Sequence, residues 1–226
     1  MKMNQGAMFF FAGLLLGGCA SVPFEPVKLS SVESLDARAV VTNFKEKLAN
    51  HFSILESVVI HYRGRELTAL GYSEVDEKAN AAAVAGVTPL GVKLFEVKAV
   101  KDDLKYSFSL PQIKNEMDHE KIAKAVADDV RRIYLGRVPL VDATVLMLKD
   151  KVCYRQASGK GVLEFYFGGP GNSLIEKRYR EGRHTVWSVR YFEYQAQASK
   201  IYPSKIFYEQ RDRKYTLALR LKEILA

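Results

Sequence analysis

The sequence is poor in the residues from which disulfides and metal sites are built. It contains two cysteines among 226 residues, Cys19 and Cys153, which allow one disulfide at most. Its four histidines lie far apart in the sequence, without the spacing of metal ligands. They are His51, His61, His119 and His184. We therefore predict neither a metal site nor a cofactor.

Motifs for common catalytic chemistry are also missing. There is no Gly-x-Ser-x-Gly elbow, no phosphate-binding Gly-x-x-x-x-Gly-Lys pattern and no dinucleotide fingerprint, and residues 168–171 are interpreted as a hairpin loop. The paired carboxylates at 102–103 and 128–129 are expected on solvated surface. The basic pairs 131–132 and 177–178 are scattered, without the dense patch of a nucleic-acid binder. We predict that the protein is not an enzyme, although folding can assemble a polar cluster that the sequence hides.

No apolar run is long enough to span a membrane. The longest, Ala7 to Leu16, falls short of the roughly 20 residues that a bilayer about 30 Å thick requires. It follows Lys2 and precedes small residues, which is typical of an export signal. The segment Leu16-Gly17-Gly18-Cys19 resembles the lipobox of bacterial lipoproteins. This resemblance implies cleavage before Cys19 and acylation of its thiol.

We therefore predict a signal peptide over residues 1–18, lipidation at Cys19 and an acylated tether over residues 19–30. The alternative is an ordinary secretory signal, which leaves a free thiol. No Asp directly follows the cysteine, which in enteric-type bacteria resembles an outer-membrane rather than an inner-membrane address. The predicted location is therefore the periplasmic face of the outer membrane, where the lipid anchor holds the protein. Acylation leaves Cys153 without a disulfide partner, so stability has to come from packing.

The net charge is +8, and it falls to +7 when Lys2 leaves with the signal peptide. An excess of this size is consistent with attraction to anionic lipid headgroups or to acidic partners. A solvated basic surface explains it equally well.

The remaining residues, 31–226, are predicted to form one domain dominated by strands. From Ile54 onward apolar and polar residues alternate with a period of two, which is typical of strands with one dry face. Turns are expected at residues 63–65, 158–161, 168–172, 181–182, 203–204 and 212–213. The strands are expected at residues 67–72, 81–87, 92–99, 104–110, 145–148, 152–156, 162–167, 173–180, 185–194, 206–210 and 215–221.

Two amphipathic helices accompany the strands, one over residues 40–52 with Asp36 near its N-cap and one over about 119–135. The second helix carries an apolar stripe, Ile122, Val126, Val130 and Ile133. Long antiparallel meanders curl, and an amphipathic helix can cover their open side. The predicted fold is thus mainly β with helices: an unclosed antiparallel β-barrel, or half-barrel, with a helical lid.

Aromatic residues gather on or beside the inner apolar positions of the strands. One interpretation is that, with the helical stripe, they line a cavity for an acyl chain, and the other is that they fill a solid core. The aromatic residues are Tyr106, Phe108, Phe165, Phe167, Trp187, Tyr191 and Tyr208.

Three short motifs, in this order, resemble the LolB family of outer-membrane lipoprotein receptors. They are residues 88–91 (Thr-Pro-Leu-Gly) before a strand, 134–139 (Tyr-Leu-Gly-Arg-Val-Pro) after the second helix, and 187–191 (Trp-Ser-Val-Arg-Tyr). The sequence is most similar to a group of LolB-like lipoproteins that share the Thr-Pro-Leu-Gly segment. The resemblance implies a lid-covered half-barrel that holds the acyl chains of a lipoprotein and releases them into the membrane.

By this match, Pro89, Leu90 and Gly91 correspond to a loop that enters the membrane. Thr88 departs from the family's Asn, and the alanine-rich residues before it suggest the alternative that Leu90 packs inward. The implied partners are the acyl chains of a lipoprotein or lipid, the membrane surface and a periplasmic carrier protein, and no nucleic acid. The rival hypothesis is a non-catalytic assembly lipoprotein that docks a partner in an envelope transport or biosynthesis complex.

Overall fold

The structure, a computed structural model, describes residues 22–32, 36–109 and 116–225. Within these ranges no helix is both long and apolar enough to cross a membrane. The elements are α1 (Ala37–Lys47), β1 (His51–Tyr62), β2 (Arg65–Asp76), β3 (Ala81–Val87), β4 (Lys93–Val100), β5 (Asp103–Phe108), α2 (Glu116–Tyr134), β6 (Thr144–Met147), β7 (Val152–Ser158), β8 (Gly161–Gly168), the 3-10 helix η1 (Pro170–Asn172), β9 (Ser173–Glu181), β10 (His184–Gln197), β11 (Lys200–Gln210) and β12 (Tyr215–Leu225).

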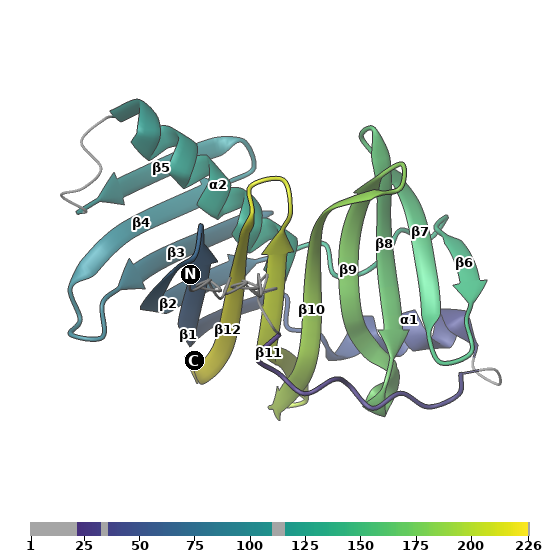
Figure 1. Cartoon of the computed structure of the whole chain (residues 1–226). Helices are drawn as coiled ribbons and strands as arrows, with labels where there is room; N and C mark the ends of the chain where they lie inside the picture. The colour runs from purple at the N-terminus through teal and green to yellow at the C-terminus, as the bar shows by residue number, and fades with distance from the viewer. Residues whose placement is uncertain (1–21, 33–35, 110–115, 226) are drawn as a thin grey trace, which may run out of the picture.

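All twelve strands belong to one antiparallel sheet, in the order β5-β4-β3-β2-β1-β12-β11-β10-β9-β8-β7-β6 (Figure 1). Two meanders, β1–β5 and β6–β12, are joined by the pairing of β1 with β12, the first and last strands. The strands β5 and β6 form the two edges and are not hydrogen-bonded to each other. The predicted half-barrel is therefore confirmed as a curved sheet that does not close.

Helix α2 connects the two edge strands and covers the inner face of the β1–β5 half of the sheet (Figure 1). Ala123 and Ala127 are buried against Val97 and Ala99 of β4, where the small side chains let helix and sheet approach closely. The helix predicted over about 119–135 is confirmed, with bounds of Glu116–Tyr134.

Helix α1 packs against the other half of the inner face. Asp36 caps it by accepting a hydrogen bond from the Arg38 backbone N–H at 2.9 Å. Its Phe44 ring meets Phe167 edge-on at 5.3 Å and Tyr194 at 5.9 Å. The prediction that this helix continues to residue 52 is wrong, because it ends at Lys47 and the period-two pattern of β1 already begins at residue 51.

The predicted turn at residues 203–204 is also wrong, since Pro203 lies inside β11. The turn instead occupies Ala198 and Ser199, both with positive φ. Proline is tolerated in β11 because the pairing of this strand with β12 begins only at Lys205, so no ladder hydrogen bond from residue 203 is lost on that side.

Residues 22–32 end at Val32, which is buried in the inner core, and begin on the outer face of the sheet. Phe24 is buried there, its ring 5.2 Å from Phe192 of β10 and 5.0 Å from the guanidinium of Arg220 of β12. At the far end of the segment, the Val32 N–H donates to the Lys149 carbonyl at 3.3 Å. The predicted tether is thus held against the domain at Phe24, whereas most of its other described residues are exposed.

Candidate functional site

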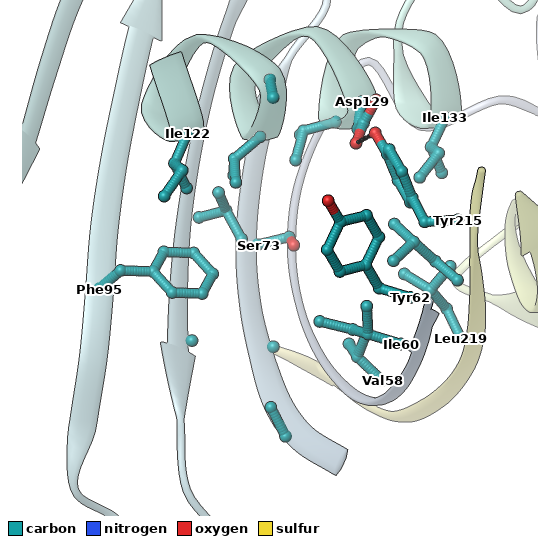
Figure 2. Close-up of a pocket in the computed structure, with 18 of the residues that line it drawn as sticks. Val58, Ile60, Tyr62, Ser73, Phe95, Ile122, Asp129, Ile133, Tyr215 and Leu219 are labelled. Carbon is teal, nitrogen blue, oxygen red and sulfur yellow. Dashed lines mark hydrogen bonds between the residues drawn. The ribbon is translucent and has the colours of Figure 1, made fainter. Parts of the chain in front are cut away.

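An apolar cavity of about 930 Å³ lies between α2 and the inner face of β1–β5 and β12 (Figure 2). This volume is near the upper end of the range of ligand pockets, roughly 300 to 1,000 Å³. The apolar wall from α2 consists of Ile122, Ala125, Val126, Val130 and Ile133. The apolar wall from the sheet includes Val58, Ile60, Val84, Phe95, Phe108, Leu217 and Leu219.

The cavity exists because the part of the sheet beneath α2 carries small side chains. The inner positions of β2 are Ala69, Gly71 and Ser73, and strand register places Gly71 opposite Gly86 of β3. The Phe95 ring lies over Gly86, 2.3 Å from the point that a β-carbon there would occupy. Gly71 projects no side chain toward the helix, and Gly86 lets the Phe95 ring lie close against β3, so the space between the layers stays open.

The mouth of the cavity is formed by two hairpin turns. The exposed lining residues, Tyr62, Arg63 and residues 212–214, all belong to the β1–β2 and β11–β12 turns or their edges. The pairing of Tyr62 with Tyr215 brings these turns together. The inward residues of β1 continue from Tyr62 to the buried Glu56, a distance of about 20 Å at 3.3 Å per residue.

A buried carboxyl group lies at the inner end of this path. Glu56 is 1% exposed and accepts a hydrogen bond from the Tyr134 hydroxyl on α2. Burial raises the pKa of Glu56 to about 7, and the Tyr134 hydrogen bond opposes the shift. The cavity wall therefore contains a carboxyl group that titrates near neutral pH.

A second carboxyl group fastens α2 to the sheet near the mouth. Asp129 accepts hydrogen bonds from the Tyr208 hydroxyl at 2.6 Å and from the Tyr215 hydroxyl, and it forms an ion pair with Arg132 at 3.3 Å. Burial raises the pKa of Asp129, and the two tyrosines oppose the shift. The prediction that Asp129 lies on solvated surface is wrong, because its side chain points at β11 and β12.

The C-terminal end of α2 is held by two more side chains. The Tyr191 hydroxyl donates to the Ile133 carbonyl at 2.6 Å, and Lys177 Nζ donates to the Leu135 carbonyl at 2.8 Å. Burial, helped by the charge of Arg137, lowers the pKa of Lys177 to about 7. Within the described ranges no three His, Cys, Asp or Glu side chains are placed to hold a metal ion.

The predicted cavity residues divide into two groups. The four residues of the α2 stripe, Ile122, Val126, Val130 and Ile133, line the cavity, and so does Phe108. A second group does not line it: Phe165, Phe167, Trp187 and Tyr191 are buried in the core of the other half of the sheet, and Tyr106 is 41% exposed at the edge strand β5. Phe167 lies against Phe44 of α1, whereas Trp187 and Tyr191 lie against the C-terminal end of α2, where they contact Arg132 and the Ile133 carbonyl.

The loop between β3 and β4 presents Leu90 to solvent, with 92% of its surface exposed. The Gly91 N–H donates to the Thr88 carbonyl at 2.9 Å, and the Val92 N–H donates to Thr88 Oγ1 at 3.1 Å. Gly91 has a φ of 83°, which glycine adopts without strain. The alternative that Leu90 packs inward is therefore wrong. Cys19 lies outside the described residues.

The fold of the chain is similar to that of solved structures. A LolA superfamily protein from Nitrosomonas europaea matches with a TM-score of 0.50 over 84% of this chain and 93% of that chain. The fold is LolA-like. A DUF1329 family protein from Desulfovibrio piger shares this LolA-like fold, with a TM-score of 0.51 over 82% and 90% of the two chains.

The likeness is one of fold and not of sequence. Both of these structures are 10% identical to this chain. No protein-family model matches the sequence, and no curated protein matches it significantly. The chemistry of the LolA-like fold in this chain therefore has to be argued from its own cavity.

Proposed function

We propose that this protein is a membrane-anchored periplasmic lipoprotein that binds the acyl chains of a lipidated cargo and passes them to the membrane. The observation that carries the proposal is the cavity of about 930 Å³ between α2 and the sheet, walled mainly by aliphatic and aromatic side chains. An apolar wall of this kind favours a hydrocarbon ligand, because burying apolar surface contributes about 25 cal/mol per Å². The two carboxyl groups buried in its wall, Glu56 and Asp129, both have hydrogen-bond partners within the protein.

The place of action in the proposal is the periplasmic face of the outer membrane, with Cys19 as the acylated residue. The support for the anchor is the lipobox-like sequence that ends at Cys19. The loop of Pro89, Leu90 and Gly91 is proposed to enter the membrane interface during release, as in the LolB family, because Leu90 is fully presented to solvent. A single leucine contributes about 1.5 to 3 kcal/mol when buried, so it perturbs lipid without anchoring the protein.

A second candidate function is favoured by a different surface. Exposed apolar side chains gather on the edge strand β6 and its flanking loops, which is a composition typical of docking sites. They are Leu140, Val141, Val145, Met147 and Leu148. A lipoprotein that docks a partner there, in an assembly or transport complex, needs no ligand in the cavity.

Binding of an environment-sensitive fluorescent fatty acid to the purified protein separates the two candidates. The carrier proposal expects saturable binding that Val126→Asp weakens by at least tenfold, because an unpaired carboxylate inside the cavity costs several kcal/mol. Lys124→Asp, on the exposed side of the same helix, is the matched control and should bind normally. If the folded protein binds no acyl probe, the carrier proposal fails and the docking proposal takes its place.

A further inference from the structure

The mouth of the cavity is cationic, although its walls are apolar. Arg63 lies in the β1–β2 turn, and Arg213 and Lys214 lie in the β11–β12 turn, all three exposed and all three lining the cavity. No ion pair involves any of these three residues within the part of the chain that the structure describes. The acid among the mouth residues, Asp212, is paired with His184 at 2.8 Å and is directed to the neighbouring turn.

The three positive charges are gathered by the fold. Tyr62 of β1 pairs with Tyr215 of β12, so two turns about 150 residues apart in sequence lie side by side. The Arg63 guanidinium is placed over the Tyr62 ring, 5.0 Å from its centre. All three cations line the same cavity as the apolar side chains of β1 and β12. The cations are therefore near the apolar walls and not only near one another.

A second, more polar cleft of about 580 Å³ adjoins the mouth. It shares Arg63, Lys214 and Tyr215 with the apolar cavity, and these three residues thus separate a hydrocarbon compartment from a polar one. The two carboxylates that line this cleft, Glu66 and Glu209, lie 3.6 Å from His61 and 3.2 Å from Arg211, whereas Arg63 and Lys214 have no acidic partner among the described residues. The two compartments are therefore complementary to an amphiphile, with the chains in the apolar cavity and an anionic headgroup beside Arg63 and Lys214.

We propose that the ligand of this cavity is an anionic amphiphile, whose phosphate or carboxylate is bound by Arg63, Arg213 and Lys214 while its acyl chain fills the cavity. The inference rests on the proposed acyl-binding function and narrows its substrate class. It favours an acidic lipid over the uncharged acyl-glyceryl group of a lipoprotein, because a neutral headgroup leaves the three cations without a partner.

The test compares probes of equal chain length that differ in headgroup charge, each displacing the fluorescent fatty acid from the purified protein. Lysophosphatidylglycerol is paired with zwitterionic lysophosphatidylcholine, and palmitate with palmityl alcohol, so the two pairs distinguish a phosphate from a carboxylate source. We expect the anionic member of at least one pair to bind about tenfold tighter, as charge-assisted hydrogen bonds allow. This preference for the anionic probe should decrease as the salt concentration is raised, because salt screens the charges at the mouth.

The double variant Arg63→Gln/Arg213→Gln should lose most of the preference for the anionic probe and keep its binding of palmityl alcohol. The matched control is Arg38→Gln/Lys160→Gln, which removes two exposed charges on α1 and on the β7–β8 turn. Equal binding of charged and uncharged probes, unaffected by the mouth variant, overturns the inference and leaves the acyl-binding function in place. Failure of every probe to bind overturns the proposed function as well.

Discussion

The hydroxyl of Tyr208 on β11 donates a 2.6 Å hydrogen bond to the carboxylate of Asp129 on α2. This contact and the one from Tyr215 join the covering helix to the last two strands beside the cavity mouth. In Asp129→Asn the side-chain amide keeps one acceptor oxygen, but its NH₂ group replaces the other. One of the two tyrosine hydroxyls therefore loses its acceptor. Asp129→Asn should therefore lower the free energy of unfolding by about 1 to 3 kcal/mol.

Urea denaturation measures that loss, and hydrogen exchange should show faster exchange in α2 of the variant. Asp128→Asn is the matched control, because Asp128 is adjacent in sequence and less buried. Equal stability of the two variants would contradict the role assigned to Asp129 as the fastening of α2.

Glu56 should give the protein a stability that depends on pH. Its pKa of about 7 in the folded state lies above the ordinary value of 4.5, so the folded protein binds this proton more tightly than the unfolded chain does. The contribution of Glu56 to the free energy of unfolding therefore falls as pH rises from about 4.5 to about 7 and is constant above that range. The total change is on the order of 3 kcal/mol.

Glu56→Gln keeps an acceptor for Tyr134 and cannot ionise, so it should be more stable than the wild type at pH 8 and similar to it at pH 4.5. Urea denaturation at several pH values measures the difference. The variant Glu74→Gln, at an exposed position of β2, should follow the wild-type curve. Parallel curves for the wild type and Glu56→Gln would rule out a raised pKa at this site.

Gly86 should be required for the open shape of the cavity. A β-carbon at this position lies 2.3 Å from the Phe95 ring, so Gly86→Ala has to displace the ring toward α2. We expect a loss of about 1 to 3 kcal/mol in stability, together with weaker binding of the fatty-acid probe. Ala85→Ser adds an atom at the next residue, on the opposite face of β3, and should bind as the wild type does. Unchanged binding by Gly86→Ala would show that acyl chains do not occupy the space beside Phe95.

Leu90→Glu should affect delivery and not folding. Because Leu90 is 92% exposed, its replacement should change stability by no more than about 0.5 kcal/mol. Binding of the acyl probe should persist, whereas transfer of the probe to liposomes should slow. Leu140→Glu introduces the same charge at another exposed leucine and should transfer normally. A well-folded Leu90→Glu variant with normal transfer would remove this residue from the proposed release step.

Cys19→Ala should abolish incorporation of a radiolabelled fatty acid and block normal processing of the precursor. Cys153→Ala is the matched control, since Cys153 is the other cysteine of the chain and is buried on β7. Labelling that survives Cys19→Ala would refute the lipid-anchor assignment.

The sequence predicted most strands and the lid helix because their periodicity is local. The strand expected over 81–87 is β3 in full, and the stripe that includes Ile122 and Val126 faces the cavity as its spacing of about one turn requires. The inner face of the sheet was also correctly recognised as rich in aromatic residues. What the pattern could not specify was which half of that face each helix would cover.

The features that were missed depend on contacts between distant strands. The opening beneath α2 follows from the register that sets Gly71 against Gly86, and the burial of Asp129 follows from its meeting Tyr208 and Tyr215. A pair of adjacent aspartates on an amphipathic helix gives no local sign that one of them will be buried. The cationic mouth likewise needs the pairing of β1 with β12, which no short motif encodes.

The packing of Phe24 against β10 and β12 limits how far the domain can move if Cys19 carries the lipid. Four residues lie between Cys19 and Phe24, and the five steps from one to the other span about 17 Å in a fully extended chain. An acylated protein would therefore stay close to the bilayer surface, whereas lipoproteins on long flexible linkers can extend far from it. It would have to act where it is attached, so any cargo that originates in another membrane has to be brought to it by a diffusing partner.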